Sequence, residues 1–428
     1  MKVIGVIRYS RGERLSREEF EELLRSAGYE VLTIVEQNRP EHPRYNIGKG
    51  KLEELKELVR ELKPDKVVFA NRLTPSQAYN LWKELRVDII DRWQLVLEIF
   101  EKRAHSKEAK LQVELASLQY EIPLVKEAIR RIKLGDRAGF KGMGEYQTRQ
   151  YLKHVRYRMG KIREELERVR ADREVKRKRR EGLGFILIAL AGYTNAGKST
   201  LLNALAGENI ETRNQMFTTL DTTTRRFKLG RKRVLLTDTV GFIDNLPPFI
   251  VEAFHSTLEE IVKADIILLV LDISEPWREV RRKLLASINV LRDLKALDKP
   301  IIVVMNKIDL TTAEDVKEKK RLIGEIVEEV APSVRAVVKT SAKLGIVDEL
   351  KHALEEIIPT LPKYKRFRIV IPPTVDPGKV LGLLESIGEV LSVSYGDKVE
   401  VDALIQVGMI KELTRMGVTL EHPSNEAD

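Results

Sequence analysis

The chain lacks cysteine altogether, which excludes disulfide bonds and thiolate metal clusters. Its six histidines are scattered without metal-ligand spacing, so a histidine-bound metal is not expected either. The longest hydrophobic run, near residues 266–271, is far shorter than the roughly 20 residues of a membrane-spanning helix. The apolar stretch at the start is too short and too strand-like for a signal peptide. These absences predict a cytoplasmic protein without a membrane contact.

The sequence does have length, hydrophobic content and positive charge. Its 428 residues are 43% hydrophobic, which is enough for two to four domains with cores. The net charge is +10, and residues 149–180 hold fourteen basic against five acidic residues, so nearly all the excess lies there. We interpret this stretch as a contact for the phosphate backbone of RNA, and a merely solvated face is the alternative. The RNA-contact candidates are Arg173, Lys176, Arg177, Lys178, Arg179 and Arg180.

One glycine-rich segment, GYTNAGKST, matches the pattern GxxxxGK[ST] of a phosphate-binding loop. Residues 185–190 precede it as a predicted buried strand, and residues 199–206 follow as a predicted helix. Because glycines let backbone N–H groups converge on anionic oxygens, we expect the loop to hold nucleotide phosphates. Lys198 should bridge the β- and γ-phosphates, and Ser199 should ligate Mg²⁺. The candidates are Gly192, Tyr193, Thr194, Asn195, Ala196, Gly197, Lys198, Ser199 and Thr200.

Two further segments predict the metal and γ-phosphate contacts. Asp238 follows the strand-like residues 234–237 and can serve the Mg²⁺ shell, while Gly241 can offer its N–H to the γ-phosphate. Upstream, residues 217–221 are rich in hydroxyl groups. We assign Thr219 to Mg²⁺ and the γ-phosphate, although the adjacent Thr218 fits the spacing equally well. The predicted metal ligands are therefore Ser199, Thr219 and Asp238.

The base-recognition residues follow later in the chain. Asn306, Lys307 and Asp309 end the apolar run 301–305, so the Asp309 carboxylate can accept from N1–H and the exocyclic amine of guanine. Adenine does not present this pair of donors, which predicts a strong preference for GTP over ATP. A second segment after a predicted strand supports the base, and it consists of Ser341, Ala342 and Lys343.

Phe242 stands where many small GTPases place a glutamine that orients the attacking water. A phenyl ring cannot take that role. We expect Lys198, Thr219 and Gly241 to support catalysis, with hydrolysis either slow until a partner orders the site or assisted by another polar group that positions the water. Alternatively, Phe242 simply packs beneath the switch region. Another possibility is a nucleotide-gated RNA-binding or remodelling module with little turnover.

The pattern of elements predicts a multidomain α/β protein in four parts. Residues 1–91 alternate strands and helices, which is typical of a small parallel α/β domain. Residues 92–181 carry two apolar seams at heptad spacing, which predicts a basic antiparallel helical hairpin of the coiled-coil type. Residues 182–361 form the P-loop G domain. Residues 362–428 read as a small α+β domain, with a helix from about Ala403 to Met416.

Residues 46–51 of the first part could be taken for a second phosphate loop. However, no buried strand precedes them, and no serine or threonine follows their lysine. We expect a helix that begins near Lys49 instead. Whether this domain holds a second nucleotide stays open at this point.

Several segments outside the nucleotide motifs carry a more specific pattern, and they are residues 46–55, 73–77, 91–92, 110–116 and 142–147. Together with the switch-like residues 219–221 and 238–242, these segments resemble the HflX family of ribosome-associated GTPases over nearly the whole chain.

The resemblance implies the same four domains and Mg²⁺-dependent hydrolysis of GTP to GDP and phosphate. It also implies nucleotide-dependent association with the large ribosomal subunit, through ribosomal RNA and ribosomal protein, with hydrolysis stimulated by the ribosome. Within this family Phe242 would be the usual residue. A GTPase of ribosome assembly is the alternative, and we expect a monomer in solution.

Overall fold

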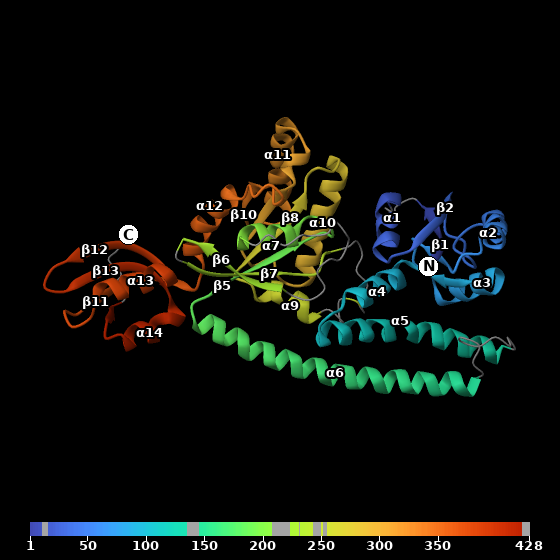
Figure 1. The fold of residues 1–428 in the computed structure, drawn as a ribbon, viewed down its shortest axis with the longest axis horizontal. Coiled ribbons are helices and arrows are strands. Elements are labelled where there is room, and N and C mark those ends of the chain that lie inside the picture. The colour runs from blue at the N-terminus through green and yellow to red at the C-terminus, as the bar shows by residue number, and fades with distance from the viewer. Residues whose placement is uncertain are drawn as a thin grey trace. The chain divides into compact units, whose positions relative to one another are not determined.

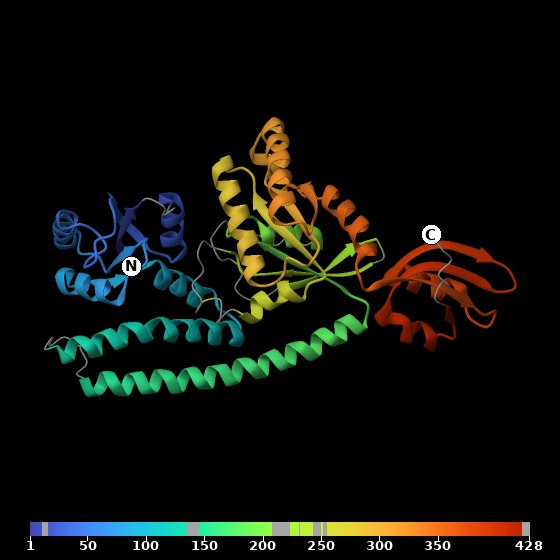
Figure 2. The same ribbon diagram turned by 180° about the vertical axis from the view of Figure 1, so that it is seen from behind.

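The structure is a computed structural model, and it divides into two compact units, which we describe separately (Figures 1 and 2). Residues 1–169 make up most of the first unit, and residues from 170 onward make up most of the second. The described residues are 1–428 without 11–15, 135–144, 208–222, 231, 243–249, 251–254 and 422–428, and for 176–182 and 255–257 only the backbone is described.

The first unit begins with the predicted parallel α/β domain. Its four strands pair in the order β2-β1-β3-β4, and all their pairings are parallel. Helix α2 begins at Lys49 after Gly48, as predicted, and the N–H of Gly48 donates to Oε1 of Gln37 at 2.9 Å. The elements are β1 (Lys2–Tyr9), α1 (Arg17–Ser26), β2 (Glu30–Asn38), α2 (Lys49–Leu62), β3 (Lys66–Phe69), α3 (Pro75–Leu85) and β4 (Asp88–Ile90).

A helical region follows, built from α4 (Arg92–Arg103), α5 (Lys107–Lys133) and α6 (Glu145–Gly182). Helix α4 packs against α1, β3 and α5. Its N-cap is Asp91, which accepts from the N–H groups of Trp93 and Gln94 and also from that of Leu73. Burial raises the pKa of Asp91 despite these hydrogen bonds. The cap therefore ties the start of α4 to the loop before α3.

Helices α5 and α6 lie side by side as the predicted hairpin (Figures 1 and 2). The apolar seams at heptad spacing explain this pairing, because each helix buries its stripe on the other. The buried cluster consists of Leu111, Leu115, Val155, Met159 and Ile162.

The second unit contains a six-stranded sheet in the order β10-β9-β8-β5-β7-β6, in which only the β6–β7 pairing is antiparallel. All seven residues of β8 are buried, because helices cover both faces of the sheet. The elements are β5 (Ile186–Gly192), α7 (Lys198–Ala206), β6 (Thr223–Leu229), β7 (Lys232–Asp238), α9 (His255–Lys263), β8 (Ile266–Asp272), α10 (Trp277–Asp293), β9 (Ile301–Asn306), α11 (Ala313–Val330), β10 (Val334–Lys339) and α12 (Asp348–Ile357).

The C-terminal part of this unit is an antiparallel sheet in the order β12-β13-β11-β14, with α13 packed against β12 and β13. This confirms the α+β prediction. Its elements are β11 (Tyr364–Ile371), α13 (Pro377–Ile387), β12 (Gly388–Tyr395), β13 (Val399–Gln406), α14 (Ile410–Arg415) and β14 (Thr419–Glu421).

The predicted helix from Ala403 to Met416 is wrong at its start. Strand β13 continues to Gln406, and helix α14 is only six residues long. Ala403 and Ile405 alternate into the core with period 2 and pair with both β11 and β12. Pairing with strands distant in sequence therefore overrode the local apolar spacing.

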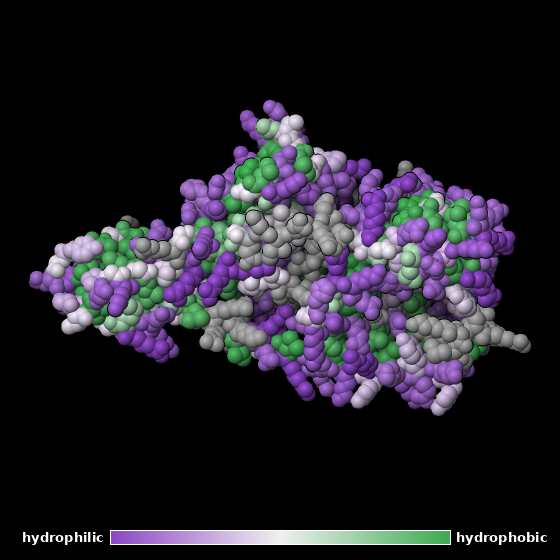
Figure 3. Space-filling model, viewed as in Figure 1, coloured by the Kyte–Doolittle hydropathy of each residue, from purple (hydrophilic) through white to green (hydrophobic). Residues whose placement is uncertain are grey.

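Most of the face drawn in Figure 3 is hydrophilic, with hydrophobic side chains gathered in separate small patches. Within the described residues, no helix combines the length and the apolar character that crossing a bilayer requires.

The hairpin seam gives a first prediction. Ile162 is fully buried, so Ile162→Ala should lower the free energy of opening of the α5–α6 pair by about 2–5 kcal/mol. Hydrogen–deuterium exchange of the α5 and α6 amides measures this opening. Tyr157→Ala on the same helix is the control, because Tyr157 is 67% exposed. Equal exchange rates in both variants would contradict the packing described here.

Candidate functional site

The glycine-rich segment forms a loop between β5 and α7, as the sequence predicts. Gly197 closes the loop with φ of +89° and serves as the N-cap of α7. A Cβ atom at Gly197 would lie 2.3 Å from Nδ2 of Asn306, so only glycine allows this approach. The loop is thereby held directly against the residue that begins the predicted base-recognition motif.

Lys198 lies buried at the start of α7. Its Nζ donates to the carbonyl oxygens of Gly192 at 3.0 Å and Tyr193 at 2.9 Å, both within the same loop. Burial lowers the pKa of Lys198 to about 8, and the charge of Asp238 opposes this shift. The ammonium group therefore lies within the loop that is predicted to hold phosphates.

Ser199 and Asp238 meet across two elements. The Ser199 hydroxyl donates to Oδ2 of Asp238 at 2.6 Å, and Asp238 is the last residue of β7 and almost fully buried. A hydroxyl and a carboxylate are hard oxygen donors of the kind that Mg²⁺ prefers. The donor set thus fits the predicted metal.

Gly241 and Phe242 are joined to the loop through the backbone. The N–H of Phe242 donates to the Gly192 carbonyl at 3.0 Å, and the N–H of Thr194 donates to the Phe242 carbonyl at 2.9 Å. A Cβ at Gly241 would lie 2.8 Å from Cγ2 of Thr194 and 3.1 Å from Nζ of Lys198. The side chain of Phe242 is buried, so it packs inside the domain.

Asn306 connects three motifs that are far apart in sequence. Its Nδ2 donates to the Ala196 carbonyl of the loop at 2.9 Å. Its Oδ1 accepts from the Thr340 hydroxyl at 3.2 Å and from the N–H of Ala342 at 3.0 Å. The Ser341 hydroxyl in turn donates to Oδ1 of Asp309 at 2.5 Å. The structure therefore brings the predicted phosphate and base residues to one edge of the sheet.

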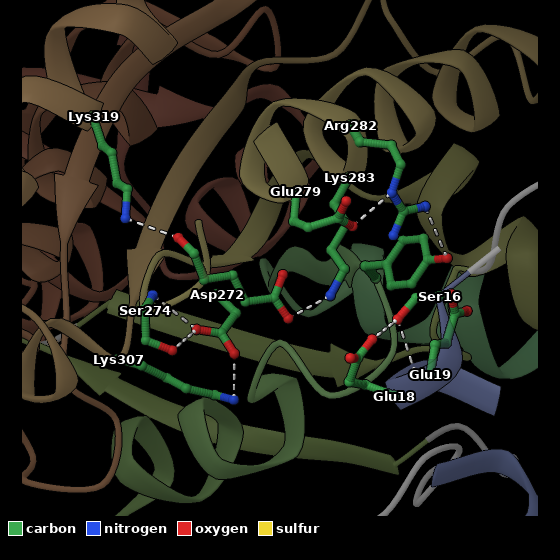
Figure 4. Close-up of polar contacts among 12 residues, drawn as sticks. Ser16, Glu18, Glu19, Asp272, Ser274, Glu279, Arg282, Lys283, Lys307 and Lys319 are labelled. Atoms are coloured by element: carbon green, nitrogen blue, oxygen red, sulfur yellow. Dashed lines mark hydrogen bonds and ion pairs between the residues drawn. The ribbon is translucent and has the colours of Figure 1, made fainter. Parts of the chain in front are cut away.

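Asp272 is a further residue of this region that the motif search missed. It ends β8 and accepts from Nζ of Lys307 at 2.6 Å and from the N–H and hydroxyl of Ser274 (Figure 4). Lys319 supports the adjoining turn, because its Nζ donates to the carbonyls of Ile273 and Glu275. The sequence signal that could have identified Asp272 is a carboxylate at the end of an apolar run, which is the same signal as for Asp238.

Several predicted residues stand apart from this constellation. Thr219 and its competitor Thr218 lie outside the described residues. Lys343 is exposed, and Thr200 lies in the first turn of α7. Arg173 is half-buried on α6, whereas for Lys176, Arg177, Lys178, Arg179 and Arg180 only the helical backbone is described.

The first unit contains a cleft of about 860 Å³ between α3, β4, α4 and α5. More carboxylates than amines line it, which disfavours a phosphate-bearing ligand there. The charged lining residues are Asp88, Glu98, Glu101, Glu114, Glu121 and Glu127 against Lys66 and Lys110.

The sheet order of the second unit, with the glycine-rich loop after β5 and Asn306 at the end of β9, defines a P-loop GTPase. Three family models match: "GTP-binding GTPase N-terminal" over residues 14–101, "GTP-binding GTPase Middle Region" over 103–180 and "50S ribosome-binding GTPase" over 187–307. The GTPase HflX of Thermococcus kodakarensis is 73% identical over 428 residues, which are 100% of this chain and 97% of that protein. The chain belongs to the GTPase HflX family.

Other relatives agree with this assignment. The GTPase HflX of Methanocaldococcus jannaschii is 46% identical over 348 residues, covering 81% of this chain and 84% of that protein. The crystal structure of the SsGBP–GDP complex is 28% identical, with a TM-score of 0.51, and covers 83% of this chain and 98% of that chain. The protein therefore binds and hydrolyses GTP and associates with ribosomes.

The base contact gives a second prediction. Asp309 is predicted to accept from two guanine donors, so Asp309→Asn, which removes the charge and one of the two acceptor oxygens, should lower GDP affinity by roughly 10- to 100-fold. It should raise affinity for xanthosine diphosphate, whose carbonyl can accept from the new amide. Calorimetric titration measures both. Ser341→Ala removes only the hydroxyl that donates to Asp309 and should keep the guanine preference. An unchanged preference in Asp309→Asn would contradict the assignment.

The buried ammonium gives a third prediction. With a pKa of about 8, Lys198 is partly neutral at pH 8 in protein prepared without nucleotide. Phosphate favours the charged form, so GDP binding near pH 8 should take up protons, and affinity should fall as the pH rises further. Calorimetry in two buffers of different ionisation enthalpy measures the uptake. In Lys198→Arg the side chain stays charged, so the proton uptake should vanish. Equal proton uptake by the parent protein and by Lys198→Arg would show that Lys198 is not its source.

Proposed function

We propose that this chain is a Mg²⁺-dependent GTP switch whose nucleotide state controls its docking on the large ribosomal subunit. The observation that carries this proposal is the Asn306 side chain, which hydrogen-bonds the phosphate loop at Ala196 and the base-side segment at Ala342. A nucleotide held by both segments is bound through its base and its phosphates at the same time. Because ribosomes act in the cytoplasm, we assign the protein to that compartment.

Within the site, the roles follow from position and chemistry. Lys198 bridges the β- and γ-phosphates, and Gly241 donates its N–H to the γ-phosphate. Ser199, Thr219 and Asp238 serve Mg²⁺. The other loop residues supply backbone N–H groups to the phosphates, except Thr194, whose N–H donates to the Phe242 carbonyl.

On the base side, Asp309 selects guanine, and Ser341 orients its carboxylate through the 2.5 Å hydrogen bond. Asn306 and Lys307 hold the base-side segment, and Ala342 and Lys343 complete it. The ion pair of Lys307 with Asp272 restricts the Lys307 side chain.

The docking element is the basic end of α6, which contacts the phosphate backbone of ribosomal RNA through charge. Its residues are Arg173, Lys176, Arg177, Lys178, Arg179 and Arg180. We keep the four-part division at residues 91, 181 and 361 as the working description of the domains. The family model described as "50S ribosome-binding GTPase" supports the choice of subunit.

Two ion pairs within the second unit support coupling between the site and α6. Arg170 of α6 pairs with Glu259 of α9 at 3.1 Å, and Glu174 pairs with Lys263 at 3.0 Å. Helix α9 is the first described helix after Gly241 in sequence. A conformational change at Gly241 that moves α9 is therefore transmitted through these two ion pairs to residues 170–174 of α6. These residues directly precede the basic residues 176–180.

The test is co-sedimentation with ribosomes across a salt series, with a non-hydrolysable GTP analogue, with GDP and without nucleotide. We expect binding with the analogue and weaker binding with GDP. The triple reversal Arg177→Glu, Arg179→Glu, Arg180→Glu should weaken binding and reduce the slope of log affinity against log salt by about 2 to 3, since each phosphate contact contributes about 0.7–0.9.

A matched control reverses three exposed lysines elsewhere on the second unit, Lys317, Lys379 and Lys411. This variant changes the net charge equally and should bind as the parent does. Binding that ignores the nucleotide would overturn the proposed switch. A triple reversal that behaves like the control would overturn the docking element.

A further inference from the structure

The Thr194 hydroxyl differs from the other hydroxyls of the site. Thr194 is 3% exposed, and its Oγ1 atom is buried without a hydrogen-bond partner among the described residues. Buried polar groups nearly always have partners, so an exception at a predicted catalytic site indicates a function. Four other hydroxyls of the site, by contrast, donate to protein groups: Ser199 to Asp238, Thr239 to Leu190, Thr340 to Asn306 and Ser341 to Asp309.

The position of Thr194 brings it next to the γ-phosphate contacts. A Cβ atom built on Gly241 would lie 2.8 Å from Cγ2 of Thr194 and 3.1 Å from Nζ of Lys198. The methyl group and Cα of Thr194 therefore line the same small space as the two residues to which we assign the γ-phosphate, and the hydroxyl is bonded to the same Cβ as that methyl group. No larger group than hydrogen fits at 241 without moving them.

The residue is also held in place. Its N–H donates to the Phe242 carbonyl at 2.9 Å, and its β-branched side chain has few accessible rotamers. The preceding residue, Tyr193, is buried, with the Arg282 guanidinium carbon 5.3 Å and the Lys283 ammonium 5.0 Å from its ring centroid. Such cations stabilise the ring, so the backbone from Tyr193 to Thr194 is restrained.

Water attack on the γ-phosphoryl group needs a polar group that orients the water, and Phe242 cannot provide one. Its ring is buried, and its backbone N–H and carbonyl are both bound to the phosphate loop. We propose that the Thr194 hydroxyl holds the attacking water against the γ-phosphoryl group. This inference rests on the proposed function, because it takes Lys198 and Gly241 as the γ-phosphate contacts.

In the reaction, the water donates one hydrogen bond to Oγ1 of Thr194 and directs a lone pair at phosphorus. The new bond joins the water oxygen to phosphorus, and the bond from phosphorus to the β–γ bridging oxygen breaks. That electron pair leaves with GDP, and the water proton passes to an oxygen of the phosphate product. Thr194 is neither consumed nor deprotonated, so no further reactant is required.

The experiment compares Thr194→Val, which keeps the shape and removes the hydroxyl, with Thr194→Ser, which keeps the hydroxyl. Single-turnover GTP hydrolysis is measured with and without saturating ribosomes. In Thr194→Val it should fall at least tenfold, while Thr194→Ser stays within about threefold of the parent. Affinity for GDP and for a non-hydrolysable GTP analogue should stay within twofold in both variants.

A second readout separates catalysis from structure. GDP with aluminium fluoride imitates the transition state, so its affinity should fall in Thr194→Val and not in Thr194→Ser. A hydrolysis rate of Thr194→Val equal to that of the parent protein would overturn the inference. An equal loss of GDP affinity and of hydrolysis rate would also overturn it, because such a loss indicates a structural role. If ribosomes do not stimulate GTP hydrolysis by the parent protein, the proposed function is contradicted. The role of Thr194 is still tested in that case, because the variants are also compared without ribosomes.

Discussion

The side-chain amide of Asn306 is the interaction on which the nucleotide site depends. It makes three hydrogen bonds while almost fully buried, to the carbonyl of Ala196, the hydroxyl of Thr340 and the N–H of Ala342. Each partner left unsatisfied inside the domain would cost about 1–3 kcal/mol. The loop glycine Gly197 belongs to the same constraint, since any side chain there would collide with the amide. Phosphate binding and base recognition are therefore parts of one packed unit.

Much of the site was predictable because its signals are local. The glycine-rich loop places Lys198 at the start of a helix, and the polar residues after apolar runs place Asp238, Asn306 and Ser341 at or just after strand ends. In a parallel sheet the carboxyl ends of the strands meet at one edge, which is why residues over 100 positions apart converge. The start of α2 was equally local, since the glycine at position 48 directly precedes the helix that begins at Lys49.

The features that the sequence did not reveal depend on distant partners. Asp272 ends an apolar strand as Asp238 does, but its ion pair with Lys307 at the end of the neighbouring strand is not visible in any local pattern. The strand that contains Ala403 exists because β11 and β12 pair with it, while its apolar spacing alone also suits a helix. The burial of Phe242 and of the Thr194 hydroxyl is likewise a tertiary property. Local patterns thus locate the chemistry, and packing decides how each group is presented.

The backbone pairing of Gly192 and Thr194 with Phe242 has a consequence for how this region can vary. It is a short parallel ladder, and the register of a ladder counts whole residues. One residue inserted or deleted between Asp238 and Phe242 would break either the pairing or the end of β7. Side-chain identity is a separate constraint, and it is strict at Gly241, where a Cβ atom would lie 2.8 Å from Cγ2 of Thr194. Relatives that carry other side chains between Asp238 and Phe242 should therefore still have the same number of residues in this segment.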